Sequence, residues 1–208
     1  TPTNIESETL PEYPQEPNFP TGEAEAIRRL EDFLVRDQGI YRYGEDRNRM
    51  DLDGTSNLSP YLHFGVLGLR TAFHHARQAI QHASNKLAQK SAATWLNELI
   101  WREFYVHIHY HFPQVHGLSF RPVYDRIVWE NDAEAFAAWC EGRTGYPIVD
   151  AAMRQLTQTG WMHNRARMIA ASFLVKDLLI DWRWGEAFFI EHLVDRSEER
   201  RVGKECRS

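Results

Sequence analysis

Residues 161–180 constrain the fold most, because they contain neither proline nor glycine and are typical of one continuous helix. Gly160, directly before them, is expected to end a preceding helix. On the predicted helix Trp161, Asn164 and Met168 fall on one face, at spacings i, i+3 and i+7. An indole, an amide and a thioether on a shared face indicate a binding site, and a polar helix end is the simpler alternative.

The remaining chain predicts an all-α fold, because no alternating strand pattern and no internal repeat interrupt the helical periodicities. We expect a polar loop over residues 40–54, a loop or short extended piece over 121–129, and a turn over 182–185. The expected helices cover residues 21–37 with Thr21 as the cap, 69–83, 86–111, about 132–141, 147–159 and 186–194.

Composition limits the class of protein. The 208 residues are 43% hydrophobic and 12% aromatic, which is typical of a packed globular chain. We find no apolar run of the roughly 18 residues that a membrane span needs, and no signal peptide. Cys140 and Cys206 make no disulfide framework, so we expect a reducing, cytoplasmic setting. The net charge of −5 argues against diffuse nucleic-acid affinity but is compatible with a local basic groove.

Residues 55–60 place four small polar side chains directly before Pro60, with Ser59 as the expected helix cap. Hydroxyl and free N–H groups at a helix start suit an anion, so a phosphate-binding turn is one interpretation. An ordinary capped turn is the alternative, and the residues alone do not decide between them.

The predicted helix 86–111 carries Glu98, Trp101, Arg102 and Tyr105 on one face. A carboxylate beside an indole suits a planar ligand with hydrogen-bond donors at its edge. An ion pair between Glu98 and Arg102 next to a packed tryptophan is the simpler alternative.

Three histidines, His107, His109 and His111, crowd the end of this helix and raise the possibility of a metal site. No Glu or Cys completes a ligand spacing, and histidine near a helix C-terminus suits the helix dipole. We therefore expect no metal, and a helical metal-binding protein stays open as an alternative.

Four motifs together carry a resemblance to a known family. They are Thr55-Ser-Asn-Leu-Ser59, Trp95-Leu-Asn-Glu-Leu-Ile-Trp-Arg-Glu-Phe-Tyr105, Gly142-Arg-Thr-Gly-Tyr-Pro-Ile-Val-Asp-Ala-Ala-Met-Arg154 and residues 160–182. In this order they resemble the FAD-binding helical domain of class I cyclobutane pyrimidine dimer photolyases, in the photolyase and cryptochrome superfamily. The resemblance covers Tyr43 to Asp195.

The resemblance implies that FAD is the cofactor, active in its reduced form. The turn at residues 55–59 matches the family's contacts to the FAD phosphates and ribityl chain, and Arg167 and Asp195 match residues beside the flavin ring. The implied cofactor-binding residues are Tyr43, Thr55, Ser56, Asn57, Leu58, Ser59, Trp95, Arg102, Asn164, Arg167 and Asp195.

The resemblance also implies light-dependent repair of UV-damaged DNA, by electron transfer from reduced FAD to a flipped-out pyrimidine dimer. Arg47 and Arg165 match DNA-contacting positions, and Trp129 and Trp182 match the outer and middle members of a tryptophan chain that reduces oxidised flavin. The residues implied to hold the dimer are Glu98, Trp101, Trp161, Asn164 and Met168.

Two departures from the family pattern set the expected domain division. Residues 1–20 match a linker remnant, without the N-terminal α/β domain that can hold an antenna chromophore, so we expect no antenna on this chain. Residues 21–195 match a partial helical domain, and the charged residues 196–208 break the pattern and suggest a non-native, adapter-derived tail, with a natural solvated tail as the alternative. We therefore expect an inactive or weakened fragment, monomeric and without a membrane partner. A cryptochrome-like photoreceptor without repair activity is the rival function.

Overall fold

The computed structural model describes residues 18–37, 39–115 and 117–195. Within these ranges the chain forms α-helices and two short 3-10 helices and no β-strand, which confirms the predicted all-α class. Most of the predicted linker and all of the predicted tail lie outside the described residues. The elements are α1 (Glu23–Val35), α2 (Tyr43–Asp46), α3 (Ser59–His63), α4 (Leu69–His82), α5 (Lys86–His111), η1 (Pro113–Val115), η2 (Pro122–Arg126), α6 (Ala133–Cys140), α7 (Pro147–Thr159), α8 (Asn164–Lys176) and α9 (Trp182–His192).

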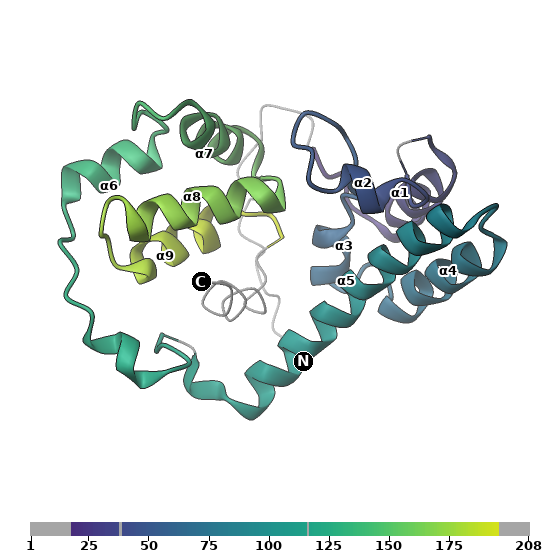
Figure 1. Ribbon diagram of the computed structural model, residues 1–208, viewed down its shortest axis with the longest axis horizontal. Coiled ribbons are helices and arrows are strands. Elements are labelled where there is room, and N and C mark those ends of the chain that lie inside the picture. Colours follow the sequence, from purple (N-terminus) through teal and green to yellow (C-terminus); the bar gives the residue numbers. More distant parts are fainter. Residues whose placement is uncertain (1–17, 38, 116, 196–208) are drawn as a thin grey trace, which may run out of the picture.

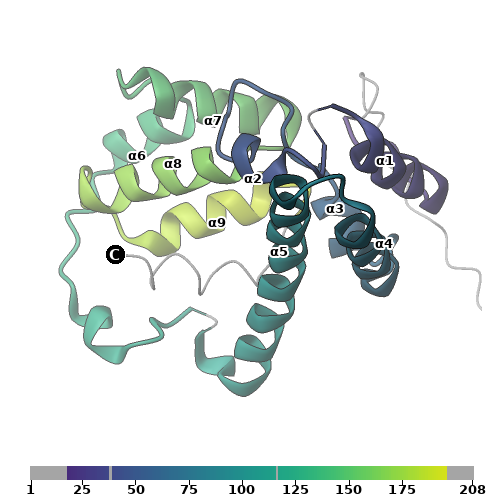
Figure 2. The same ribbon diagram turned by 45° about the vertical axis from the view of Figure 1, so that its right-hand side comes forward.

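The helices form two lobes (Figure 1). The first lobe consists of α1 to α5 and the second of α6 to α9, and the segment with η1 and η2 connects them. In both ribbon views the start of α8 and the end of α9 face the first lobe (Figures 1 and 2). Residues far apart in the sequence therefore meet where the lobes adjoin.

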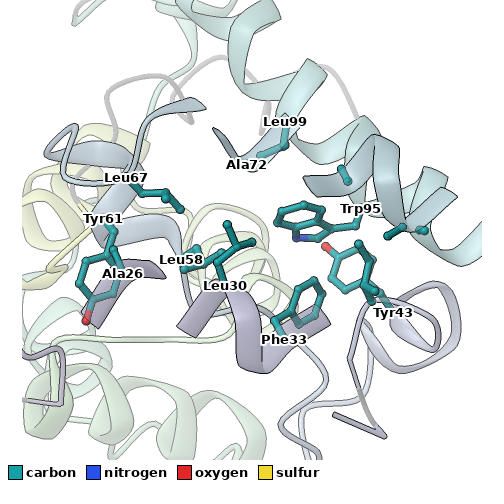
Figure 3. Packing of buried hydrophobic residues seen from close by; sticks show 14 residues of the cluster. Ala26, Leu30, Phe33, Tyr43, Leu58, Tyr61, Leu67, Ala72, Trp95 and Leu99 are labelled. Atoms are coloured by element: carbon teal, nitrogen blue, oxygen red, sulfur yellow. The ribbon is translucent and has the colours of Figure 1, made fainter. Parts of the chain in front are cut away.

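The core of the first lobe is built on α1 and the first half of α5. Leu30 and Phe33 of α1 are fully buried, and the Phe33 ring centroid lies 5.3 Å from that of Trp95. Tyr43 meets Phe33 edge-on at 6.0 Å, so the three rings point toward one another (Figure 3). On α4 the buried residues are alanines, which allow that helix to lie close to α5.

The core of the second lobe surrounds Trp139 of α6, whose side chain is fully buried. Its indole N–H donates to the Ala170 carbonyl at 3.0 Å, which satisfies its only polar group. Phe136 stacks on it at 5.9 Å, and Phe189 meets it edge-on at 5.5 Å. This cluster joins α6, α8 and α9.

The start of α8 corrects the prediction for residues 161–180. The helix begins at Asn164, because the side chain of His163 caps it by accepting the Arg165 N–H at 3.0 Å. Trp161 therefore precedes the helix and does not share its face with Asn164. The helix ends at Lys176.

Two predicted caps were wrong. Gly22 stands at the N-cap of α1 in place of Thr21, and Leu58 stands at the N-cap of α3 in place of Ser59. Neither residue caps its helix with a side chain. The predicted loop at residues 40–54 contains the short helix α2, whose residue Tyr43 is buried in the core.

The predicted turn at residues 182–185 was also wrong, because these residues form the first turn of α9. Asp181 caps the helix by accepting the Arg183 N–H at 3.0 Å. Gly185 lies inside this helix, and position 185 requires glycine because Leu174 of α8 occupies the space that a Cβ would need. The glycine thus serves close helix packing.

The second half of α5 stands apart from both cores. Every buried α5 residue lies at or before Leu99. Beyond it Trp101 is 45% exposed, Phe104 47% and Tyr110 79%. No helix in the described ranges combines the length and apolar character needed to cross a membrane.

Candidate functional site

One group of predicted site residues lies between α2 and α5. Arg47, which follows α2, forms a short ion pair with Glu98 on the exposed face of α5. Its guanidinium lies 6.0 Å from the Tyr43 ring. The predicted DNA-contacting arginine and the predicted dimer-binding acid are therefore direct partners.

The same face of α5 continues with Trp101, one turn beyond Glu98. Its indole stacks on Tyr105 with ring centroids 6.0 Å apart and stays half-exposed. Arg102 contacts Glu103 at 3.0 Å and the Leu62 carbonyl at 3.4 Å. The structure thus pairs Glu98 with Arg47, where the simpler sequence interpretation paired it with Arg102.

The turn at residues 55–59 is held by its own side chains and by that of Asp53. Thr55 donates to the Asn57 side-chain oxygen at 3.1 Å, and the Asn57 amide donates to Asp53 at 2.9 Å. Leu58 is buried in the first core, and Asn57 adopts a positive φ of 52°. The backbone N–H groups of residues 56–59 donate no hydrogen bond to any described residue. Free N–H donors of this kind suit phosphate oxygens.

The second group lies around α8. Arg167 forms an ion pair with Asp195, in which Nη2 donates to Oδ2 at 3.0 Å and Nη1 lies 2.9 Å from Oδ1. Its Nε also donates to the Met162 carbonyl at 2.7 Å. Both charged side chains are buried, so this pair is a rigid part of the second lobe.

Asn164 and Met168 lie together at the start of α8, since the Asn164 amide is 3.8 Å from the Met168 sulfur. Trp161 lies just before this helix and meets the His163 ring edge-on at 6.3 Å. Three of the five predicted dimer-binding residues therefore lie at or just before the start of α8, and Trp161 does not share a helix face with the other two.

The two groups meet at one junction. Arg165 of α8 donates to the side-chain oxygen of Asn48 at 2.7 Å, and Asn48 directly follows Arg47. The predicted DNA-contacting Arg165 of the second lobe therefore contacts the first lobe right beside Arg47, the other predicted DNA-contacting arginine. We call the surface formed by Arg47, Asn48, Glu98 and Arg165 the junction.

His163 is buried directly beside this junction, and no sequence motif pointed to it. Burial lowers the pKa of its ring, and the charges of Arg165 and Arg167 lower it further, against the opposing effect of the Arg47 backbone. A neutral imidazole is therefore favoured, which suits its role as helix cap. The only hint in the sequence was that His163 lies between the predicted site residues Trp161 and Asn164.

Trp129 and Trp182 lie away from the junction. The Glu130 N–H donates to the Leu179 carbonyl at 2.9 Å, which brings the two tryptophan segments side by side. Trp182 opens α9 and Asp195 follows its end, so about 15 Å of helix separates them. The Arg183 guanidinium covers the Trp182 ring at 4.8 Å.

The histidine cluster shows no metal-binding geometry. The His107 and His111 rings stack with centroids 6.3 Å apart. Among the described residues, no three His, Cys, Asp or Glu side chains gather in a way that could hold an ion.

Comparisons with known proteins agree with this architecture. A family profile described as "FAD binding domain of DNA photolyase" matches residues 95–204. The deoxyribodipyrimidine photo-lyase of Synechococcus sp. is 51% identical over 88% of this chain, and that of Escherichia coli is 48% identical over 86%. The chain therefore belongs to the family of FAD-binding domains of DNA photolyases.

Solved structures show the same likeness. A class III photolyase from Agrobacterium tumefaciens is similar with a TM-score of 0.77 and 41% identity over 88% of this chain and 37% of that one. A Synechocystis cryptochrome is similar with a TM-score of 0.81 and 34% identity, over 90% and 38% respectively. The chain spans 37% of the length of each of the two curated relatives named above.

Proposed function

We propose that this chain supplies the flavin-binding part of a deoxyribodipyrimidine photo-lyase of class I, which repairs cyclobutane pyrimidine dimers in UV-damaged DNA. The observation that carries the proposal is the junction, where Arg47 contacts Glu98 and Arg165 contacts Asn48. Membership of the photolyase family supports it. We further propose a monomeric, cytoplasmic protein without a membrane partner.

The proposed cofactor is FAD, which when bound in its reduced form supplies the light-driven electron for opening the cyclobutane ring. The residues fit such a group, because the N–H donors of residues 56–59 suit its diphosphate. Arg167 and Asp195 bring a fixed pair of charges that suits the polar edge of its ring. Tyr43, Trp95, Arg102 and Asn164 complete the proposed contacts, and we propose that this chain binds no antenna chromophore.

Glu98 would hold the dimer by accepting hydrogen bonds from the pyrimidine edges. Trp101 and Trp161 would pack against the extruded bases, at about 1–3 kcal/mol per aromatic contact. Asn164 and Met168 would contact the other side of the dimer. This packing would offset part of the cost of flipping the dimer out of the duplex.

Arg47 and Arg165 would bind backbone phosphates beside the dimer. On binding DNA, Arg47 would leave its ion pair with Glu98 and bind a phosphate instead. The Glu98 carboxylate would then be free to bind the dimer. Affinity for DNA should accordingly fall with salt. Trp129 and Trp182 would form the route by which an electron reaches oxidised flavin.

The Glu98→Gln variant tests the proposed division of roles. It keeps the shape of the side chain and removes its charge, so affinity for an oligonucleotide with a thymine dimer should drop about tenfold. FAD binding should stay unchanged, because Glu98 is proposed to contact the dimer. The control is Glu191→Gln, an exposed acid on α9. Equal losses of dimer and FAD binding would contradict the proposal.

A cryptochrome-like blue-light photoreceptor is the second candidate, since the Synechocystis cryptochrome is similar with a TM-score of 0.81. That function needs flavin but no dimer pocket. A chain that binds FAD and fails to distinguish dimer-containing from undamaged DNA would favour it.

A further inference from the structure

Arg36 reaches from the end of α1 to the turn at residues 55–59. It follows α1 as its C-cap residue, and its guanidinium packs over the buried Phe33 ring at 5.5 Å. From there Nη2 donates a short hydrogen bond to the Thr55 carbonyl, and Nη1 pairs with Asp53 at 2.6 Å. One side chain thus ties the first core to both ends of the segment 53–55.

Asp53 carries the contact onward into the turn. Its second oxygen accepts the Asn57 amide at 2.9 Å, and the Asn57 oxygen accepts the Thr55 hydroxyl at 3.1 Å. Asn57 is held at a φ of 52°, a conformation that costs free energy in a residue with a side chain. The chain of contacts from Arg36 through Asp53 offsets that cost.

Charge gives Arg36 a second role. Asp53 lies two residues before the turn and pairs with the Arg36 guanidinium, and Asp32 lies 3.8 Å from the same guanidinium. Without Arg36, two carboxylates would repel any anion that approached the N–H groups of residues 56–59. With Arg36 in place, its positive charge compensates the negative charge of Asp53, and Asp53 can still accept the hydrogen bond from Asn57.

We propose that Arg36 and Asp53 are positioning residues that preset the turn at residues 55–59 for the phosphate groups of a flavin nucleotide. The inference rests on the proposed FAD-binding role of that turn. Neither residue needs to touch the ligand, because both act through the backbone of Thr55 and the side chain of Asn57.

Substitution of Arg36 is sterically tolerable. A polar pocket of about 230 Å³ lies on the α1 side of the turn and is lined in part by Arg36, Asp53 and Asn57. A shorter polar side chain at position 36 therefore leaves space that water can fill, not an apolar cavity. Changes in ligand binding can then be separated from changes in folding.

The test compares three probes on the full chain: FAD, riboflavin, which lacks phosphate, and inorganic pyrophosphate. Flavin fluorescence follows the first two, and calorimetry follows pyrophosphate. Arg36→Gln should weaken FAD and pyrophosphate about tenfold, the size expected for loss of a charge-assisted contact. Riboflavin binding should not change, whereas a merely structural defect would weaken both flavins alike.

A rescue sharpens the test. Arg36→Gln combined with Asp53→Asn removes both charges and leaves two amides that can bond to each other, so FAD affinity should recover in part. Arg36→Lys should also keep part of it, because it retains the charge without the fork. The controls are Arg49→Gln and Asp51→Asn, which remove an exposed ion pair on the adjacent loop. These substitutions should leave all three affinities unchanged.

Each outcome decides the question. Equal weakening of FAD and riboflavin, an unchanged pyrophosphate affinity in Arg36→Gln, or no pyrophosphate binding by the wild-type chain would each overturn the inference. A chain that binds pyrophosphate in the predicted Arg36-dependent way and fails to bind FAD would instead overturn the proposed function. The two failures are therefore distinct.

Discussion

The two ion pairs among the candidate site residues differ in burial, and this difference separates their roles. Arg47 and Glu98 are both partly exposed, with side-chain exposures of 35% and 43%. Such a pair contributes little to stability and exchanges partners easily. Arg167 and Asp195 are 6% and 1% exposed, so neither charge can lose its partner cheaply.

Replacing the arginine of each ion pair by methionine should show the difference in their contributions to stability. Arg167→Met leaves Asp195 buried without its partner and should lower the free energy of unfolding by about 3–5 kcal/mol. Arg47→Met, the matched change at the exposed pair, should cost less than about 1 kcal/mol. Urea denaturation followed by circular dichroism measures both. Similar losses in the two variants would show that burial does not set the strength of these pairs.

Asp150 should make stability depend on pH. Burial opposes its ionisation, but hydrogen bonds from the Thr144 hydroxyl and N–H and from the Gly145 N–H outweigh burial and hold its pKa below the usual 3.8. Because the folded pKa is depressed, the stabilisation is present above pH 3.8 and is lost as the pH falls through the lower folded pKa.

The Asp150→Asn variant should therefore be less stable than the wild type by about 2 kcal/mol near neutral pH. The gap should close in strong acid, and urea midpoints across the pH range measure it. Asp177→Asn, an exposed change on the second lobe, is the control. A gap that stays constant with pH would exclude the carboxylate as its source.

At the scale of elements, the turn between α7 and α8 positions the end of the described chain. Gly160 ends α7 with a φ of 67°, and its carbonyl accepts the Val194 N–H at 2.9 Å. A Cβ at Gly160 would lie 2.7 Å from the Val194 side chain. The turn thus holds Val194, and with it the neighbouring Asp195, against α8.

Gly160→Ala should lower the free energy of unfolding by about 2 kcal/mol, from backbone strain and overpacking together. Thermal or urea denaturation measures the loss. Combining it with Val194→Ala should restore part of the stability, because it removes the clash but not the strain. No rescue would mean that the clash contributes nothing.

The two halves of α5 should differ in local stability. All its buried residues lie at or before Leu99, whereas Trp101, Phe104 and Tyr110 are largely exposed. Few buried contacts mean low free energies of local opening. Hydrogen exchange should be faster after Leu99 than before it, and uniform protection along α5 would contradict this.

At the scale of the whole molecule, sequence patterns predicted the helical class and most helix positions. The span of α5 was predicted correctly, because Lys86 to His111 is bounded by clear start and stop signals. The start of α9 was missed, since Gly185 reads as a turn until Leu174 is seen to fill the space beside it. Helix ends that depend on a neighbouring helix cannot be read from local sequence.

The candidate site was predictable only in part for the same reason. Residue types and the family resemblance identified Glu98 and Arg47, but nothing local indicated that they pair across the space between α2 and α5. Arg36 acts through its contact with Thr55, which is distant in sequence, and His163 acts through its burial. No local sequence motif therefore marks either residue as part of a site.

The most direct test of the account is whether the purified chain, mixed with FAD and passed through gel filtration, elutes with bound flavin. We predict a flavin absorbance that co-elutes with the protein at a ratio near one to one, reduced in the Arg167→Met variant. A chain that elutes folded and without flavin would contradict the claim that its residues form an FAD-binding site.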